Sequence, residues 1–400
     1  MKRGRRTAFI CFAAALLTGL FSVSVLLILT SAAPEKPAVP TAVTAPAPDT
    51  LAARLDEICA AYGAVGAQAA AIRGDEILLY QYGYADREAG RAVTADTKYR
   101  VASLSKLAAD MVFLGMEEDG LVRRHADIGD YLGYPVRNPL YPTVPVTPEM
   151  LMCHLSSLRD SDAFLASRQQ ASAVPLAQLL QREDSFSETA PGTAYLYSNF
   201  GVAVLGAVCE KAANTPFNVL ARMYLFSKLE IDAAFAAREL PAADSLGVLY
   251  GPDGLSAQAQ LSAGFSSELG QTHHLVQGNL TISAQDYARL LYPLLHEGVG
   301  FNGARLLRPD TVKAVVSPHF TSADGGVGYG LRILQNAVGP GRQLVHTGSN
   351  FGMLSAFVIW PETGNAAVVL TSGARGDVDP ATGIYRVCYD LIRAIGDSLN

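Results

Sequence analysis

A serine and a lysine stand three residues apart where a long apolar stretch of the chain begins. In a helix, Ser103 and Lys106 of the segment SLSK lie one turn apart on the same face. A serine hydroxyl is a poor nucleophile at neutral pH without an adjacent base, and burial favours the neutral amine of a lysine, which can accept a proton. The pair therefore indicates nucleophilic catalysis, although a chain of this length contains S-x-x-K about once by chance.

The element that must carry this pair is a predicted helix over residues 103–118. Its side chains are apolar almost all round and Gly115 is its one glycine, which is typical of a helix buried in a core. Lys106 is costly in such a setting unless it is paired or used. The amino terminus of the helix also directs backbone N–H groups and a positive dipole end toward Ser103, where negative charge would develop on a substrate carbonyl.

Two further motifs follow along the chain. The first is Y-S-N at residues 197–199, and the second is H-T-G at residues 346–348, on a predicted strand. The order S-x-x-K, Y-x-N, H-T-G resembles the serine beta-lactamase and penicillin-binding-protein superfamily, in the branch with class C beta-lactamases, secreted DD-carboxypeptidases and related esterases. The resemblance runs over nearly all of residues 51–400. Supporting stretches are YRVA at 99–102, LMCHLSSL at 151–158, PGTAYLYSNFG at 191–201 and YGL at 329–331.

The resemblance implies a role for each motif residue. Ser103 becomes acylated, Lys106 takes its proton, and Tyr197 relays a proton to the leaving group. The backbone N–H groups of Ser103 and Ser349 form the oxyanion hole, and Asn199 holds the substrate amide. The implied substrate-binding residues are Asn199, His346, Thr347, Gly348, Ser349 and Arg332. Plainer alternatives are a core aromatic for Tyr197, a helix cap for Asn199 and a satisfied strand histidine for His346.

The third motif bears on the substrate. The beta-lactamases have a lysine where this chain has His346, so a mostly neutral imidazole replaces a permanent cation, and H-T-G is more similar to the secreted DD-carboxypeptidases. Peptides that end in D-Ala-D-Ala carry a carboxylate, for which Arg332 and Arg342 are candidate partners.

One departure from the family pattern lies between the first two motifs. The chain reads H-L-S-S at residues 154–157, where the family usually has H-T-S-G. Loss of the glycine removes a residue that freely adopts positive φ, so a different loop and a different range of substrates become possible. His154 itself is interpreted as structural.

The leading hypothesis is a membrane-tethered serine hydrolase that cleaves peptide or amide bonds through an acyl-enzyme, like a DD-carboxypeptidase acting on cell-wall D-Ala-D-Ala peptides. An esterase or weak beta-lactamase with the same residues is one alternative. A penicillin- or peptidoglycan-binding module without turnover is another, and the intact Ser103, Lys106 and Tyr197 argue against it. The expected partners are peptide or ester substrates, including peptidoglycan stem peptides and beta-lactams, and no cofactor or metal is implied.

The amino-terminal residues predict the compartment. Basic residues precede an uncharged run at 8–30, whose 23 residues span about 34 Å as a helix, enough for a bilayer. Residues 1–32 are therefore predicted to be a cytoplasmic basic tip and a single-pass anchor in the cell membrane, with the remainder exported. A cleavable signal peptide, which would give a secreted protein, is the alternative. Residues 33–50, rich in Pro and Ala, predict an extended tether.

Residues 51–400 predict one two-lobed catalytic domain of the α/β class, of α+β type. A hairpin at 67–84 and a meander at 329–371 predict an antiparallel sheet, flanked by helices at 51–62 and 385–399. This is the beta-lactamase/transpeptidase-like architecture that the resemblance implies. The α/β lobe is expected at about 51–127 and 280–400, an inserted helical lobe at about 128–235, and long connections at 240–280.

Composition excludes other classes of protein. Half of the 400 residues are apolar and 17% are charged, which excludes a disordered chain. The net charge is −6; the first 50 residues carry five basic and two acidic residues, which leaves −9 for the rest and argues against a nucleic-acid partner. The five cysteines lack metal-ligand spacing and are interpreted as buried thiols, with a Cys59–Cys388 disulfide as the alternative.

Overall fold

The structure, a computed structural model, describes residues 43–167, 174–241, 245–256, 266–323 and 325–399. The predicted cytoplasmic tip, the anchor or signal peptide, and the first ten residues of the predicted tether lie outside these ranges. Within them, no helix combines the length and the apolar character that crossing a membrane requires.

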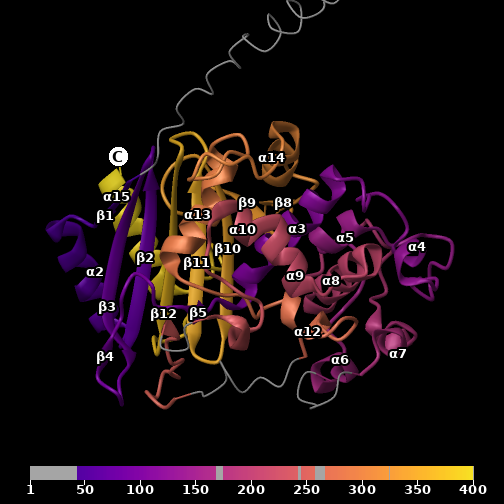
Figure 1. Cartoon of the computed structure of the whole chain (residues 1–400), viewed down its shortest axis with the longest axis horizontal. Helices are drawn as coiled ribbons and strands as arrows, with labels where there is room; N and C mark the ends of the chain where they lie inside the picture. Colours follow the sequence, from indigo (N-terminus) through magenta and orange to yellow (C-terminus); the bar gives the residue numbers. More distant parts are fainter. Residues whose placement is uncertain (1–42, 168–173, 242–244, 257–265, 324, 400) are drawn as a thin grey trace, which may run out of the picture. The chain divides into compact units, whose positions relative to one another are not determined.

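A large sheet runs through the described domain (Figure 1). Its strand order is β1-β3-β2-β12-β11-β10-β9-β8-β7, and β4 pairs with β3 beside this path. The pairs are antiparallel except that of β1 with β3. The strands, including the separate β5–β6 pair, are β1 Val43–Pro46, β2 Gly66–Arg73, β3 Glu76–Asp86, β4 Arg91–Ala92, β5 Tyr99–Arg100, β6 Thr281–Ile282, β7 Phe320–Ser322, β8 Gly325–Gly328, β9 Leu331–Gln335, β10 Arg342–Asn350, β11 Met353–Trp360 and β12 Asn365–Ser372.

Helices pack against both faces of the middle strands of the sheet. β11 and β12 are buried along their whole length and are mostly apolar, as is typical of strands inside a layered fold. On one face, α2 (Asp49–Ala61) and α15 (Arg386–Leu399) share a hydrophobic core with the sheet. On the other, α13 (Ala284–Leu295) contacts β2 and β12 and belongs to a second, larger core. The sheet is thus the middle layer of three.

Most of the remaining helices gather at one side of the sheet, around α3 and α8 (Figure 1), whereas α14 contacts α13 and β8. The predicted helical stretch at 128–235 contains α4 to α10, and α3 is buried over most of its length, as its composition predicts. These helices are α3 Ser105–Glu118, α4 Ile128–Leu132, α5 Pro148–Met152, α6 Asp162–Ser167, α7 Leu176–Leu180, α8 Asn199–Ala213, α9 Phe217–Ala221, α10 Ser227–Leu229, α12 His273–Val276 and α14 Pro309–Val316. Short turns are the 3-10 segments η1 Ala102–Leu104, η2 Glu183–Ser185 and η4 Ala237–Glu239, and the π-helical η3 Arg222–Phe226.

The structure confirms the predicted fold class but shortens the predicted tether. The hairpin, the four meander strands and the two flanking helices form close to their predicted positions. However, Val43–Pro46 is a strand, β1, in which the Val43 N–H donates to the Asp75 carbonyl oxygen at 2.9 Å. Its position at a sheet edge tolerates proline. The packed part of the chain therefore begins by Val43, before the predicted start at residue 51.

The four described cysteines are buried free thiols. Cys59 on α2 and Cys388 on α15 belong to the same hydrophobic core, and burial raises the pKa of the Cys59 thiol to about 11. The predicted alternative of a disulfide between them is therefore not formed. Cys11 lies outside the described residues.

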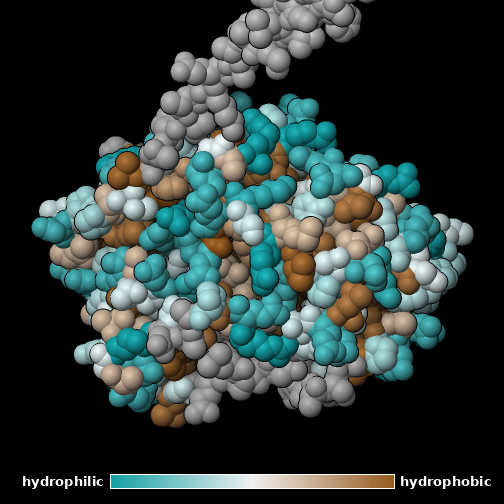
Figure 2. Space-filling model, in the orientation of Figure 1, coloured by the Kyte–Doolittle hydropathy of each residue, from teal (hydrophilic) through white to brown (hydrophobic). Residues whose placement is uncertain are grey.

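Polar residues cover most of the face of the molecule drawn in Figure 2. Apolar residues occur on this face as small, separate groups. Scattered apolar residues of this kind are ordinary on a protein surface.

Candidate active site

A tight turn presents Ser103 at the start of α3. Ser103 lies in η1, directly before the helix. Ala102 has a φ of 52°, a left-handed conformation that costs a non-glycine residue about 1–2 kcal/mol. Ser105 Oγ holds the turn, because it donates to the Ala102 carbonyl oxygen at 2.6 Å and accepts from the Leu280 N–H at 3.0 Å. The position of Ser103 is thus fixed by its neighbours.

Lys106 is fully buried next to Ser103. Its Nζ lies 3.1 Å from Ser103 Oγ, 2.8 Å from Asn199 Oδ1 and 2.7 Å from the carbonyl oxygen of Gln277. The last two oxygens can only accept hydrogen bonds. As an ammonium, Lys106 donates to all three oxygens. Once the amine is neutral, these two acceptors take its two N–H bonds, and its lone pair faces Ser103. This geometry suits Lys106 to remove the proton of the serine hydroxyl.

Tyr197 contacts the same serine oxygen. Its hydroxyl donates to Ser103 Oγ at 2.7 Å, and 38% of the residue is exposed. Its ring packs on that of His154, with 4.5 Å between the ring centroids. Desolvation of its hydroxyl raises the pKa of Tyr197 above the ordinary tyrosine value. Tyr197 is therefore a protonated phenol at neutral pH and can serve as the acid while Lys106 serves as the base.

Asn199 begins α8 but does not cap it. The cap is Ser198, whose Oγ accepts from the Gly201 N–H at 2.9 Å. The amide of Asn199 instead lies between Lys106 and Asp160, to which its Nδ2 donates at 2.7 Å. Asp160 and Gln277 were not predicted, because both lie in loops without a recognisable motif.

The third motif lies on β10, at the edge of a cleft. β11 pairs with residues 344–350 of β10, whereas β9 pairs only with residues 342–345. The edge at 346–350 therefore has no described strand on the β9 side. A Cβ at Gly348 would lie 2.7 Å from the Val101 carbonyl oxygen and 3.0 Å from the Ser103 nitrogen. Glycine thus permits β10 to approach the turn that carries the nucleophile.

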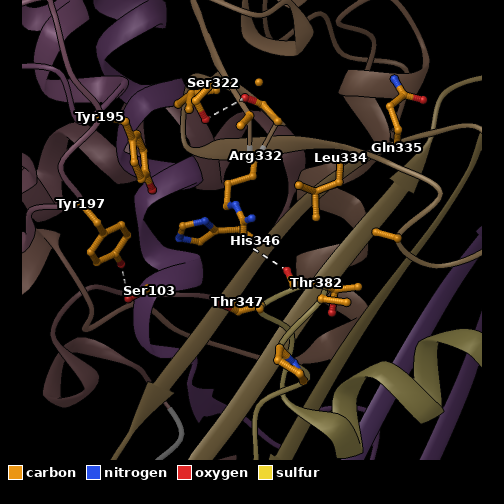
Figure 3. A pocket seen from close by; sticks show the side chains of 18 of the residues that line it. Ser103, Tyr195, Tyr197, Ser322, Arg332, Leu334, Gln335, His346, Thr347 and Thr382 are labelled. Carbon is orange, nitrogen blue, oxygen red and sulfur yellow. Dashed lines mark hydrogen bonds between the residues drawn. The ribbon is translucent and has the colours of Figure 1, made fainter.

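The cleft has a volume of about 1070 Å³. Figure 3 shows Ser103, Tyr197, His346 and Arg332 around it. The predicted residues that line it are Ser103, Tyr197, Asn199, Arg332, His346, Thr347 and Ser349. Gly348 and Lys106 do not line the cleft, and Lys106 Nζ contacts Ser103 Oγ. Arg342, the other candidate for binding a carboxylate, does not line the cleft either. Its Nε lies 4.0 Å from Glu362 Oε1.

His346 and Arg332 project into the cleft beside one another (Figure 3). Burial, with the nearby charges of Lys106 and Arg332, lowers the pKa of His346 to about 3. The imidazole is therefore neutral at neutral pH, and within the described part of the chain its Nε2 has no hydrogen-bond partner. Arg332, on β9, donates to the Thr382 carbonyl oxygen at 3.2 Å and makes no ion pair with a described residue.

The loop before α6 keeps a left-handed conformation without the glycine usual in the family. Ser157, at that position, has a φ of 61° and accepts a hydrogen bond from Asn138 Nδ2 at 3.1 Å. His154 is buried and its Nδ1 accepts from the Ser198 N–H at 3.2 Å. Burial lowers the pKa of His154 well below the ordinary histidine value. These contacts support the interpretation of His154 as a structural residue behind Tyr197.

The sequence is similar to known proteins over its predicted domain. Residues 51–387 match the beta-lactamase family. Penicillin-binding protein 4* of Bacillus subtilis is 25% identical over 156 residues, 38% of this chain and 33% of that protein. D-alanyl-D-alanine-carboxypeptidase/endopeptidase AmpH of Escherichia coli K12 is 25% identical over 167 residues, 41% of this chain and 43% of that protein. The chain therefore matches less than half the length of either relative.

A solved structure extends the likeness to the fold. The class C beta-lactamase from Rhodobacter sphaeroides matches with a TM-score of 0.69 and 18% identity, over 88% of this chain and 100% of that one. At this low sequence identity, the structural match shows a shared fold and nothing about activity. The match over residues 51–387 covers more than half of the sequence. The chain therefore belongs to the beta-lactamase family, whose members are serine hydrolases.

Proposed function

We propose that this chain hydrolyses amide bonds through an acyl-enzyme on Ser103, and that its substrates are cell-wall peptides that end in D-Ala-D-Ala. One observation carries the proposal: Ser103 Oγ lies 3.1 Å from Lys106 Nζ and 2.7 Å from the Tyr197 hydroxyl. A base and an acid thus contact one nucleophile, and positioned proton transfer contributes about 10²- to 10⁴-fold to rate.

In the proposed acylation, Ser103 Oγ attacks the carbonyl carbon while its proton passes to Lys106. The backbone N–H groups of Ser103 and Ser349 stabilise the oxyanion. Tyr197 protonates the leaving nitrogen as the C–N bond breaks, and the ammonium of Lys106 returns a proton to the phenolate. Water then attacks the ester carbon and gives a proton to Lys106. The bond from that carbon to Ser103 Oγ breaks, Lys106 passes the proton to Ser103 Oγ, and the shortened peptide leaves as its carboxylic acid.

The proposed substrate class rests on the other side of the cleft. Arg332 and Thr347 both line the cleft, so a terminal carboxylate could bind to the Arg332 guanidinium and the Thr347 hydroxyl. The hydrogen bond to the guanidinium would be charge-assisted, which makes it about twice as strong as a neutral one. The edge of β10 at residues 346–350 could pair with an extended peptide, as in strand addition. The proposal also places the domain outside the cytoplasm, as residues 1–32 predict.

The size of the cleft favours a second candidate function. Its volume of about 1070 Å³ is at the upper end of small-molecule sites, about 300–1,000 Å³, so substrates larger than a dipeptide would fit. An ester or a beta-lactam would use the same Ser103, Lys106 and Tyr197. A simple ester carries no carboxylate, so its binding would not require Arg332.

A substrate panel tests the proposal. The full chain and Ser103→Ala would be incubated with a D-Ala-D-Ala peptide, a fluorescent penicillin and a short acyl ester. We expect D-Ala release by the unsubstituted chain and none by Ser103→Ala. Ester or beta-lactam hydrolysis without D-Ala release would favour the second candidate, and labelling without turnover a binding module. Equal activity of Ser103→Ala would contradict both functions.

A further inference from the structure

Asp160 is a carboxylate behind the cleft that the proposed reaction does not use. It lies in the loop between Ser157 and α6, is half-buried and does not line the cleft. Asp160 Oδ2 accepts from Asn199 Nδ2 at 2.7 Å. Asp160 Oδ1 accepts from the Phe200 N–H at 2.8 Å and from Ser198 Oγ at 3.4 Å. The carboxylate thus joins one loop to three successive residues at the start of α8.

These contacts hold the carboxylate in a single position. The Phe200 N–H is one of the donors at the amino end of α8 that have no partner inside the helix. A negative charge is also stabilised near this end of the helix dipole. With Oδ1 fixed by the helix, Oδ2 is held facing the side chain of Asn199. Asp160 therefore has one oxygen for the backbone of α8 and one for the amide.

The amide of Asn199 has two chemically different ends, and its two neighbours distinguish them. On one side, the carboxylate of Asp160 accepts only and requires the NH₂ group. On the other side, Lys106 Nζ lies 2.8 Å from Asn199 Oδ1 and donates to it. A flipped amide would place two acceptors together at Asp160 and two donors together at Lys106. Asp160 thus selects the orientation that gives Lys106 an acceptor.

That acceptor determines where the lone pair of Lys106 points. When the amine is neutral, Asn199 Oδ1 and the Gln277 carbonyl oxygen together take its two N–H bonds. If Asn199 rotated, one of these bonds would be lost and the amine could turn away from Ser103. The effect of Asp160 on Ser103 thus passes through two intermediate side chains. The four side chains form one continuous hydrogen-bonded chain.

We propose that Asp160 is a positioning residue for acylation: through the amide of Asn199 it directs the lone pair of Lys106 at Ser103. This inference rests on the proposed function, because it assumes that Ser103 is acylated. The sequence offers no motif for it, since Asp160 lies in a loop and reaches Asn199, 39 residues away, only in the folded chain.

A kinetic double-mutant cycle tests the proposal. The acylation rate constant of Ser103 by a fluorescent penicillin would be measured for the full chain, Asp160→Ala, Asn199→Ala and the double variant. We expect Asp160→Ala to slow acylation about 10- to 100-fold, as for loss of a hydrogen bond to a charged group. In the Asn199→Ala background the same substitution should change the rate less than about twofold, because coupled residues are not additive.

Two further variants separate positioning from folding. Asp160→Asn keeps the shape and one acceptor oxygen, so we expect a rate between those of Asp160 and Asp160→Ala. Asp127 is the matched control, because it also accepts from a backbone N–H at a helix start, that of Gly129 at 2.9 Å, and does not line the cleft. Asp127→Ala should acylate like the unsubstituted chain, even if its unfolding temperature falls as much.

The outcomes divide between this inference and the function beneath it. Acylation of the unsubstituted chain, with slowing by Asp160→Ala only when Asn199 is present, supports the inference. Acylation that is unaffected by Asp160→Ala, or slowed equally in both backgrounds, overturns the inference and leaves the proposed function intact. No Ser103-dependent adduct on the unsubstituted chain overturns both.

Discussion

The two ends of the cleft differ in how many partners their polar groups already have. At the end with the nucleophile, Ser103 Oγ contacts two side chains, and Lys106 Nζ lies within hydrogen-bond distance of three oxygens. At the other end, Arg332 donates to one carbonyl oxygen and makes no ion pair with a described residue, and His346 Nε2 has no partner there. The groups for bond cleavage are thus arranged before a substrate binds, whereas those for recognition await one.

The two ends also rest on different kinds of support. The nucleophile end is built from η1, α3 and the start of α8, which are held by buried hydrogen bonds such as that from Ser105 Oγ to Ala102. The recognition end is built from β9 and an adjacent loop near Thr382. Rigid support preorganises catalytic groups. We therefore expect substitutions at the first end to affect all substrates and those at the second to affect some.

The largest expected effect is at Lys106. Lys106→Ala removes the base, and we expect acylation of Ser103 to slow about 10³- to 10⁴-fold with a penicillin, a D-Ala-D-Ala peptide and an ester alike. Lys106→Arg keeps a cation that cannot accept the proton, so it should be equally slow. Rapid-mixing measurement of adduct formation checks this. Normal acylation in Lys106→Arg would show that charge, not basicity, is what the site requires.

His346, at the recognition end, should make stability depend on pH. Its pKa in the folded chain is about 3, below the ordinary value of 6.5. The unfolded chain therefore binds the proton first, and the stability present above pH 6.5 is lost as pH falls toward 3. Between pH 7.5 and 4.5, His346→Gln should lose about 2–3 kcal/mol less stability than the unsubstituted chain.

Denaturant unfolding at the two pH values measures this difference. His273 is the matched control, because burial also lowers its pKa, to about 4, and it does not line the cleft. His273→Gln should flatten the pH dependence in the same direction and leave acylation unchanged. Parallel pH dependence of His346→Gln and the unsubstituted chain would mean that the imidazole is not held neutral.

A smaller, substrate-dependent effect is expected at Arg332. Arg332→Ala should raise KM about tenfold or more for a peptide with a free terminal carboxylate. For an ester without a carboxylate, KM should remain within about twofold. Steady-state kinetics on the two substrates measures the difference, with Arg342→Ala, outside the cleft, as the control. An equal rise in KM for both substrates would show that Arg332 does not recognise the carboxylate, and would contradict the proposed recognition end of the cleft.

The smallest effect is expected at Ser157. Ser157→Gly relieves a side chain at a φ of 61° but removes the oxygen that accepts from Asn138. These changes oppose one another, so we expect the free energy of unfolding to change by less than about 1 kcal/mol. Activity on D-Ala-D-Ala peptides should stay within about threefold. A larger change in activity would show that this loop takes part in substrate recognition.

The sequence predicts the nucleophile end better than the recognition end. Ser103 and Lys106 are a local pair, so helical spacing alone predicts their contact, and the family order of motifs adds Tyr197 and Asn199. Asp160 and Gln277 complete the same site from loops, where no periodic pattern marks them. Which of Arg332 and Arg342 faces the cleft depends on the pairing of β9 with β10, which the sequence alone does not determine.

The same distinction holds for the fold. The buried strands β11 and β12 have long apolar runs and are predicted close to their positions. The missed strand β8 consists of three glycines and one valine and shows no alternation. The sequence does not predict β1, because its extended residues pair with β3, a contact that composition does not reveal. Local pattern therefore predicts the centre of the sheet and fails at its edges.

The central claim is that Ser103 is acylated by a peptide with loss of its terminal residue. Brief reaction of the full chain with a D-Ala-D-Ala peptide, an acid quench and mass spectrometry of the tryptic peptide 101–106 test it directly. The account predicts a mass gain equal to the peptide acyl group without its last D-Ala, with one D-Ala released per adduct and no adduct in Ser103→Ala. An adduct on another residue, or D-Ala release that persists in Ser103→Ala, would contradict it.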